Sequence, residues 1–275
     1  NIAKDLSKIV KISWVGDIKD PWGIYIPRPL RTFLAKHFDT CLALSTFSKF
    51  NSNDVTKWFK TPTTTIYSGY SERNSKPVNI ANLHKINISL TGGIYNYNAL
   101  KELIWGVKIW FDRLTEIEKS KVQLTYAGHD AEAVKKVMHQ FNNFCHINLI
   151  GFIPLEKLKE IHESSIANLY IKIYTTFHHK TIELLSAGRP VICYPSEIEE
   201  AINIANRSNV DLHSCNKAED VAQALSKSLN TSSINVSNNE FLQKLTWHNQ
   251  SIKLEALFKK VLDLEKIHKN RRIDI

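Results

Sequence analysis

The sequence predicts an α/β protein built on a doubly wound parallel sheet. From residue 87 onward, short runs of β-branched and aromatic residues alternate with longer amphipathic segments. Strands separated by helices of this length need right-handed crossovers, which give a parallel sheet covered on both faces. Residues 1–73 show the same alternation over a shorter stretch. We therefore expect one complete doubly wound domain and a second, partial domain of the same class.

Residues 1–73 are expected to form the partial domain. Apolar runs and amphipathic spacing predict strands at 8–15, 40–45 and 63–67, and helices at 30–37 and 53–59. Asp54 is expected to cap the second of these helices. A glycine turn at 68–70 and a polar linker at 71–76 then lead into the next domain.

Residues 74–240 are expected to form the complete domain. The β-rich runs predict strands at 87–91, 122–126, 146–150, 166–173 and 191–194. The segments around them predict helices at 98–114, 130–141, 155–163, 180–187, 197–206 and 217–229. A polar patch at 230–239 comes before a final amphipathic helix at 247–267. We expect this last segment, 241–275, to cross back to the first domain.

The overall charge predicts an anionic partner. The 36 basic and 27 acidic residues leave a formal net charge of +9, which suits nucleic acid, acidic lipid or a phosphorylated substrate. The basic residues are dispersed without an aromatic-interleaved stripe, so we expect no nucleic acid as a partner. No run approaches a membrane span in length, and no secretory signal opens the chain. These features favour a cytoplasmic protein, which its basic charge can also attach to the inner membrane face.

The cysteines carry no metal-binding pattern. Cys41, Cys145, Cys193 and Cys215 are widely spread and form no C-x-x-C pair. Zinc sites use closely spaced ligands, so this spacing predicts reduced, buried thiols and no metal.

The stretch 171–195 carries the clearest functional signal. A β-rich run leads into a polar turn with His178 and His179, and a helix then begins near Lys180. The amino end of a helix at the carboxyl edge of a parallel sheet attracts anions, and a lysine there opposes the helix dipole unless an anion offsets it. Glu183, on the first turn, can reach the hydroxyls of an attached ribose or sugar. Because the two histidines are adjacent, they point in different directions, and we expect them to bind no metal.

Glycines follow the strand-like runs that precede this stretch. Gly92-Gly93 and Gly128 each stand between a run and a helix, where a glycine turn lets a ligand approach the backbone. A tight turn with nothing bound is the alternative at both positions. After the next run, the backbone of Phe152-Ile153 can pack against a flat base.

Several acidic residues have plain structural interpretations. Asp130 is expected to cap the helix that follows it. Glu197, Glu199 and Glu200 are expected to form the solvated start of a helix.

Taken in order, these segments resemble the nucleotide-binding half of GT-B glycosyltransferases, most closely the retaining group called family 4. The matching segments are SLTGGIYNYNALKELIWG, VQLTYAGHD, INLIGFIPLEKLKEIHESSIANLYI, KTIELLSAGRPVI and LTWHNQSIKLEALFKKVL. LALSTFSKF and TTTIYSGYSER resemble the end of that family's acceptor domain. The resemblance implies two Rossmann-like domains and transfer of a sugar from a UDP- or GDP-sugar to a glycan or lipid-linked acceptor. It also implies retention of configuration, with neither a metal nor a separate cofactor.

The resemblance also implies roles for individual residues. Glu183 matches the glutamate that contacts the donor's ribose, and Gly92-Gly93 matches the loop near the diphosphate. The donor-binding residues expected on this basis are Gly92, Gly93, Gly128, His129, Phe152, Ile153, Thr175, Thr176, His178, His179 and Thr181. Catalysis is expected to involve Lys180 and Glu183, together with Asp17 at the edge of the acceptor cleft.

The chain departs from the family pattern in three ways. Thr175 stands where the family often has a second glutamate, and Gly93 and Asn98 stand where basic residues are usual. Lys180 is expected to supply the missing phosphate charge, as in relatives that read K-x-x-E at this helix. The first domain is also short, so we expect only the later part of the acceptor domain.

Three other functions are alternatives to this interpretation. A degenerate GT-B protein that binds a nucleotide or partner without transfer fits the missing basic residues. A sugar-nucleotide epimerase of the same fold lacks support from a catalytic acid pair. A nucleic-acid binder is suggested by charge alone, and its binding would depend steeply on salt.

Overall fold

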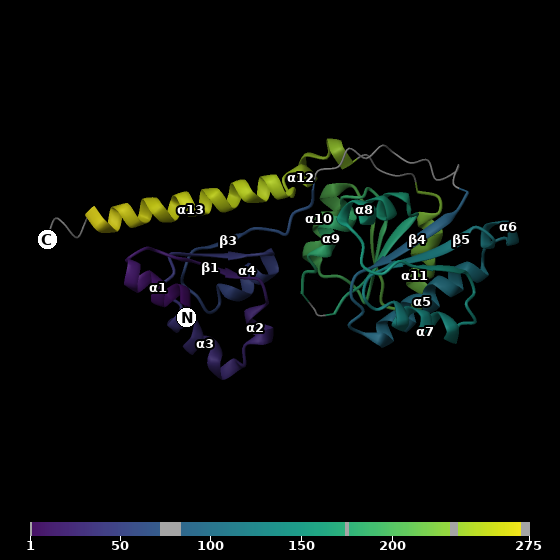
Figure 1. The fold of residues 1–275 in the computed structure, drawn as a ribbon, viewed down its shortest axis with the longest axis horizontal. Helices are drawn as coiled ribbons and strands as arrows, with labels where there is room; N and C mark the ends of the chain where they lie inside the picture. Colours follow the sequence, from purple (N-terminus) through teal and green to yellow (C-terminus); the bar gives the residue numbers. More distant parts are fainter. Residues whose placement is uncertain (1, 72–83, 174–175, 232–235, 271–275) are drawn as a thin grey trace. The chain divides into compact units, whose positions relative to one another are not determined.

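The computed structural model describes residues 2–71, 84–173, 176–231 and 236–270, and the chain divides into two compact units. The first contains Asn1–Ser71 and Lys244–Ile275, and the second contains Glu72–Gln243. Each unit is built on a parallel sheet, so the predicted α/β class is confirmed (Figure 1). Most of the expected linker, 72–76, and part of the polar patch, 232–235, lie outside the described residues.

The larger unit has a six-stranded parallel sheet in the order β6-β5-β4-β7-β8-β9. Its strands are β4 (Ile86–Thr91), β5 (Val122–Ala127), β6 (His146–Leu149), β7 (Ala167–Ile171), β8 (Val191–Tyr194) and β9 (Leu212–Ser214). The chain order reverses between β4 and β7, which are paired through Ile88 and Ala167. In sheets of this type ligands bind beyond the carboxyl ends of the strands at this reversal.

Helices cover both faces of the larger sheet (Figure 1). One side carries α5 (Tyr97–Asp112), α7 (Ala131–Gln140) and α11 (Ala218–Ser228), and the other carries α8 (Leu155–Ser164), α9 (Lys180–Leu185) and α10 (Glu199–Ser208). On α5, the fully buried Leu100, Leu103, Ile104 and Val107 recur at helical spacing. They join residues of β4 and β5 in the main hydrophobic core.

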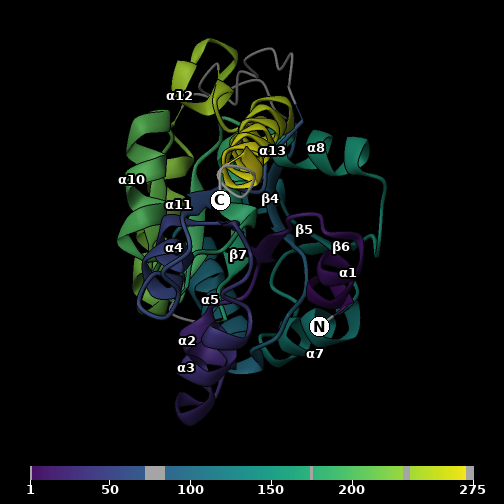
Figure 2. The same ribbon diagram turned by 90° about the vertical axis from the view of Figure 1, so that its left-hand side faces the viewer.

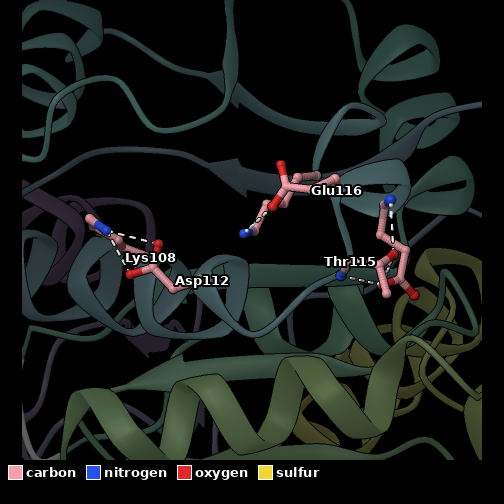
Figure 3. Close-up of polar contacts among 6 residues, drawn as sticks. Lys108, Asp112, Thr115 and Glu116 are labelled. Atoms are coloured by element: carbon pink, nitrogen blue, oxygen red, sulfur yellow. Dashed lines mark hydrogen bonds and ion pairs between the residues drawn. The ribbon is translucent and has the colours of Figure 1, made fainter.

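Local side-chain contacts set the ends of several helices. The Asn96 side chain caps α5, and Thr115 forms a capping box with Glu118 at the start of α6 (Glu116–Lys119). Solvent-accessible ion pairs also occur on these helices, including Lys108–Asp112 of α5 at 2.6 Å (Figure 3). Such exposed pairs contribute little to stability, because water and salt screen them.

The smaller unit has a three-stranded parallel sheet in the order β1-β2-β3. Its elements are α1 (Ile2–Val10), β1 (Val15–Ile18), α2 (Trp22–Tyr25), α3 (Arg28–His37), β2 (Ala43–Thr46), α4 (Lys49–Val55) and β3 (Thr63–Thr65). Helix α2 lies between α3 and α4 in both Figure 1 and Figure 2.

The final helix, α13 (Trp247–Asn270), belongs to the smaller unit. Its Leu257 and Val261 pack in one cluster with Ala43 of β2. The amide of Tyr67 donates a hydrogen bond to the side chain of Gln250 at 2.9 Å. The short helices η2 (Val236–Asn238) and α12 (Glu240–Gln243) precede it in the chain.

The first unit differs from the prediction at two places. The strand expected at 8–15 is instead the end of α1 followed by β1, and Lys11, with φ of 53°, ends the helix. A continuous apolar run does not distinguish a strand from a helix. The helix expected at 53–59 begins earlier, at Lys49, because Ser48 caps it. Asp54 is not a cap; its carboxylate accepts a hydrogen bond from the amide of Gly23 at 2.5 Å.

Strand β9 was not predicted, because its three residues are too few and too polar to give a β pattern. It pairs with β8 at the edge of the larger sheet. Within the described part of the chain, no helix is both long and apolar enough to span a bilayer.

Candidate functional site

A pocket of about 160 Å³ opens where the order of the larger sheet reverses. Its walls come from the carboxyl ends of β4 and β5, the residues that follow β4, β5 and β6, one residue of α8 and the first turn of α9. The lining residues are Thr91, Gly92, Gly93, Ala127, Gly128, His129, Gly151, Phe152, Ile153, Leu158, Lys180 and Glu183. A concave site at this position is where parallel α/β sheets bind their ligands.

Lys180 and Gly92 lie next to each other in the pocket wall. The Lys180 ammonium donates a hydrogen bond to the carbonyl of Thr91 at 2.8 Å. Gly92 has φ of +94°, and a Cβ atom built on it would lie only 1.7 Å from Lys180 Nζ. Glycine is therefore the residue that permits both this backbone conformation and the position of the ammonium.

Burial lowers the pKa of Lys180, and the nearby Glu183 carboxylate opposes this shift. Both side chains project from the first turn of α9 into the pocket. An added phosphate would favour the charged form of the lysine further. The pocket thus combines one cation with one carboxylate at its α9 wall.

Tyr126 and Asp130 fix the loop that contains Gly92. The Tyr126 hydroxyl donates to the carbonyl of Gly92 at 2.7 Å and accepts from the amide of Asp130 at 3.0 Å. The Asp130 carboxylate accepts from the amide of Ile94 at 2.8 Å. Asp130 makes no cap hydrogen bond to α7, so the predicted capping role is wrong. Its side chain instead holds the neighbouring loop.

Backbone hydrogen bonds join the glycine loops to one another. The amide of Gly92 donates to the carbonyl of Ala127, and the amide of Gly128 donates to the carbonyl of Gly151, both at 2.9 Å. A Cβ at Gly128 would lie 2.6 Å from the carbonyl oxygen of Gly92. Glycine at 128 therefore allows the two loops to approach closely.

The other end of the pocket presents aromatic rings. His129 and Phe152 stack with their centroids 5.3 Å apart and their planes at 10°. Phe152 is 80% exposed although it is a large apolar side chain. A flat, exposed aromatic surface beside a pocket is suited to stacking against a planar ligand ring.

The histidine pair lies outside the pocket wall. His178 stacks on His179 with centroids 5.1 Å apart, and His178 Nδ1 accepts a hydrogen bond from the amide of Lys180 at 3.3 Å. Burial, together with the positive charges of His179, Lys180 and Lys172, lowers the pKa of His178 to about 3. His178 is therefore neutral at physiological pH and acts as an acceptor.

We expect His178 to make folding sensitive to acid. Its folded-state pKa of about 3 lies below the ordinary 6.5, so the unfolded chain binds the proton first and stability falls as pH drops between these values. Replacing His178 with glutamine removes this titration. Urea unfolding of both proteins at about pH 7.5 and about pH 5 measures the effect, with His146→Gln on the exposed start of β6 as control. Equal acid sensitivity of the wild type and His178→Gln would contradict it.

The remaining predicted residues occupy other positions. Thr176, His178, His179 and Thr181 do not line the pocket, and Thr175 lies outside the described residues. Thr181 is fully buried on α9. Asp17 belongs to the smaller unit, where its carboxylate accepts from the Ser45 hydroxyl at 2.8 Å and pairs with Lys19 at 3.3 Å.

A buried ion pair joins the end of β7 to the segment after β8, and it was not predicted from the sequence. Lys172 Nζ lies 3.3 Å from Glu197 Oε2, and the side chains are only 5% and 0% exposed. The expected solvated position of Glu197 is therefore wrong. A lysine within the apolar run IKIY was the available signal, since a charge placed among buried strand residues needs a partner.

The cysteines are free thiols within the described chain. Cys41, Cys193 and Cys215 are buried, and Cys145 is partly buried. Burial raises the pKa of Cys145 and of Cys215 to about 12, which keeps both protonated. Among the described residues, no group of three or more His, Cys, Asp or Glu side chains is placed to hold a metal ion.

Several solved structures have a fold similar to that of this chain. No protein-family model and no curated protein matches the chain in sequence. HepE from Anabaena, in complex with UDP and glucose, superposes with a TM-score of 0.66 at 12% identity, over 94% of this chain and 75% of that chain. Sucrose-phosphate synthase from Thermosynechococcus elongatus gives a TM-score of 0.69 at 15% identity, over 96% and 71%. A glycosyltransferase from Rickettsia africae gives 0.62 at 13% identity, over 95% and 80%. The GT-B-like fold predicted from sequence is confirmed.

Proposed function

We propose that this chain is a glycosyltransferase that binds a nucleotide sugar in the pocket between Gly92 and Glu183. The single observation that supports this most is the placement of the Lys180 ammonium over the Gly92 loop at the sheet reversal. A cation pairs with the negative charge of a diphosphate, and a glycine loop lets the diphosphate approach the backbone closely. Nucleotide sugars present that diphosphate between a base and a sugar.

The lining residues suit the parts of such a donor. Lys180 pairs with the diphosphate, Glu183 on the same turn accepts from ribose hydroxyls, and the Phe152 ring stacks on the base. HepE holds UDP and glucose, and its fold is the same, so we favour a UDP-sugar as donor. Transfer then breaks the bond between the sugar and the diphosphate, and Lys180 stabilises the negative charge that develops on the leaving group.

The proposed reaction is retaining, uses neither a metal nor a separate cofactor, and delivers the sugar to a glycan or lipid-linked acceptor. The family resemblance supports these finer features. The formal charge of +9 supports an acceptor at an anionic membrane surface. Asp17 remains a proposed catalytic residue on the acceptor side.

Binding of nucleotides tests the donor site directly. Calorimetry or thermal shift with UDP, GDP and ADP at millimolar concentration is expected to show binding, with UDP the tightest. A nucleotide that binds only the folded protein raises its stability once the nucleotide concentration exceeds the dissociation constant. No change with any of the three would remove the basis for the proposed donor site.

Lys180→Ala is expected to weaken UDP binding at least about tenfold and to leave uridine binding nearly unchanged. A charge-assisted hydrogen bond to phosphate contributes about 1.5 to 3 kcal/mol to binding. Uridine has no phosphate and forms no such bond, so its affinity does not depend on the Lys180 ammonium. Calorimetry with both ligands measures the difference. Lys108→Ala removes a partly buried lysine of α5 that is paired with Asp112 and does not line the pocket, and it serves as the control. Equal losses for UDP and uridine would assign Lys180 some other role.

Phe152→Ala is expected to weaken uridine and UDP by similar factors and to leave inorganic pyrophosphate unaffected. Stacking of a base on an aromatic side chain is worth about 1 to 3 kcal/mol. Competition binding with the three ligands measures this pattern. Phe33→Ala, at a ring that is 66% exposed in the smaller unit, is the matched control. A loss of pyrophosphate binding would show that Phe152 acts on the whole loop instead.

A second candidate is a GT-B protein that binds a nucleotide without transferring a sugar. Among the described residues that line the pocket, Lys180 is the one lysine or arginine, and the positions Gly93 and Asn98 supply no further cation. A single cation gives less stabilisation of a leaving diphosphate than two. Hydrolysis or transfer measured with a panel of nucleotide sugars separates the two candidates, because only a transferase releases the nucleoside diphosphate.

A further inference from the structure

We propose that Tyr170, Lys172 and Glu197 are positioning residues that hold α9 at the distance from the Gly92 loop which nucleotide binding requires. None of them lines the pocket. The inference rests on the proposed nucleotide site, which it deepens by naming residues that act through others.

The three residues form one buried polar cluster. The Tyr170 hydroxyl donates to Glu197 Oε1 at 2.7 Å, and Glu197 Oε2 pairs with Lys172 Nζ at 3.3 Å. Lys172 also donates to the carbonyl of Ser196 at 3.0 Å. The cluster thereby ties the end of β7 to the segment that follows β8. The amide of Glu197 donates in addition to the Ser214 hydroxyl of β9 at 2.7 Å.

Tyr170 connects this cluster to α9 on both sides of Lys180. Its hydroxyl lies 3.1 Å from the Thr181 hydroxyl, which is buried on α9. Its ring packs against His178 with centroids 5.4 Å apart, and His178 Nδ1 accepts from the amide of Lys180. Tyr170 therefore contacts both Thr181, which follows Lys180, and His178, which lies two residues before it.

The pocket depends on this attachment because α9 is short. The helix has only six residues, and both Lys180 and Glu183 lie on it. The Lys180 ammonium reaches the carbonyl of Thr91 at 2.8 Å, so a shift of the helix by about 1 Å would break that hydrogen bond. Apolar packing tolerates such a shift more readily than directional hydrogen bonds do. A fully satisfied polar cluster selects one position of the helix.

Tyr170→Phe provides the sharpest test, because it removes one hydroxyl and leaves the ring and the ion pair in place. Thr125→Val is the matched control, since Thr125 is buried on β5 and donates to Asn87, away from α9. Binding of UDP and uridine by each variant is measured by calorimetry, and thermal unfolding gives the stability of each. We expect Tyr170→Phe to weaken UDP about tenfold and uridine by a smaller factor, since a shift of α9 displaces the Lys180 charge from the phosphate and Glu183 from the ribose. Thr125→Val is expected to lower the melting temperature similarly without this selective loss.

A readout without nucleotide keeps the test independent of the proposed function. Acetylation of Lys180 by acetic anhydride, followed by mass spectrometry of the peptide, reports how firmly the ammonium is held. We expect faster acetylation in Tyr170→Phe than in the wild type and in Thr125→Val. If no protein binds UDP but acetylation follows this order, the positioning role stands and the nucleotide site fails. If UDP binds equally to all three proteins, or Lys180 reacts equally in all, the positioning role is overturned.

Discussion

Replacing Gly92 with alanine is expected to reduce UDP affinity by about 10- to 100-fold, as much as removing the Lys180 side chain does. The new Cβ would lie 1.7 Å from Lys180 Nζ, so the ammonium must move away from the carbonyl of Thr91 and from the proposed phosphate site. The φ of +94° adds a backbone cost of about 1 to 2 kcal/mol to the folded state. Calorimetry with UDP and urea unfolding measure the two effects separately.

Two comparisons isolate the steric effect of Gly92→Ala. Gly151 also has a positive φ, +75°, but a Cβ there meets no atom within 4 Å. Gly151→Ala therefore shares the backbone cost without displacing Lys180, and its UDP affinity is expected to fall much less. In the double variant with Lys180→Ala, the change at Gly92 is expected to add little further loss. Additive losses in that cycle would show that Gly92→Ala acts by another route.

Replacing Lys172 with methionine is expected to lower the free energy of unfolding by about 3 kcal/mol or more. The change leaves the Glu197 carboxylate, whose side chain is 0% exposed, without its cationic partner. An uncompensated charge is costly in a buried site because its hydration is lost. Urea denaturation at neutral pH, with the slope checked for two-state behaviour, measures the loss.

The exposed pair Lys108–Asp112 supplies the contrast. Its side chains are 22% and 53% exposed, so Asp112→Asn is expected to cost less than about 1 kcal/mol. The double replacement Lys172→Met with Glu197→Met is expected to recover much of the loss, because it removes both buried charges together. A cost for Lys172→Met no larger than that for Asp112→Asn would contradict a buried pair.

Much of the larger unit could be predicted from sequence because its signals are local. The runs that became β4, β5 and β7 are apolar, bounded by glycine or polar residues, and separated by segments with helical spacing. The parallel connection rule then brings the residues after these strands to one edge. The family resemblance then implies that Gly92, Gly128 and Lys180 belong to one donor site, and in the structure all three line one pocket.

Other features depend on contacts that local sequence does not specify. Lys172 and Glu197 meet because β7 and β8 are neighbours. The apolar run around Lys172 indicates that this lysine needs a partner, but no local feature identifies Glu197 as that partner. Asp130 precedes a helix, which is the usual place of a cap, yet its carboxylate bonds to the adjacent loop at Ile94. In both cases tertiary contacts determine which of two locally possible arrangements forms.

The hydrogen bonds that join the glycine loops have a consequence for engineering base preference. Gly92 is bonded to Ala127 and to the Tyr126 hydroxyl, and Gly128 is bonded to Gly151, next to Phe152. The segments proposed to contact the base and the diphosphate are thus held together before a ligand binds, which would lower the entropic cost of binding. If residues 151–153 contact the base as proposed, a graft of this segment from a GT-B glycosyltransferase would transfer base selectivity only if it kept the hydrogen bond from the Gly128 amide to the carbonyl of residue 151. Libraries that vary these loops together should therefore yield more functional variants than libraries that vary one loop at a time.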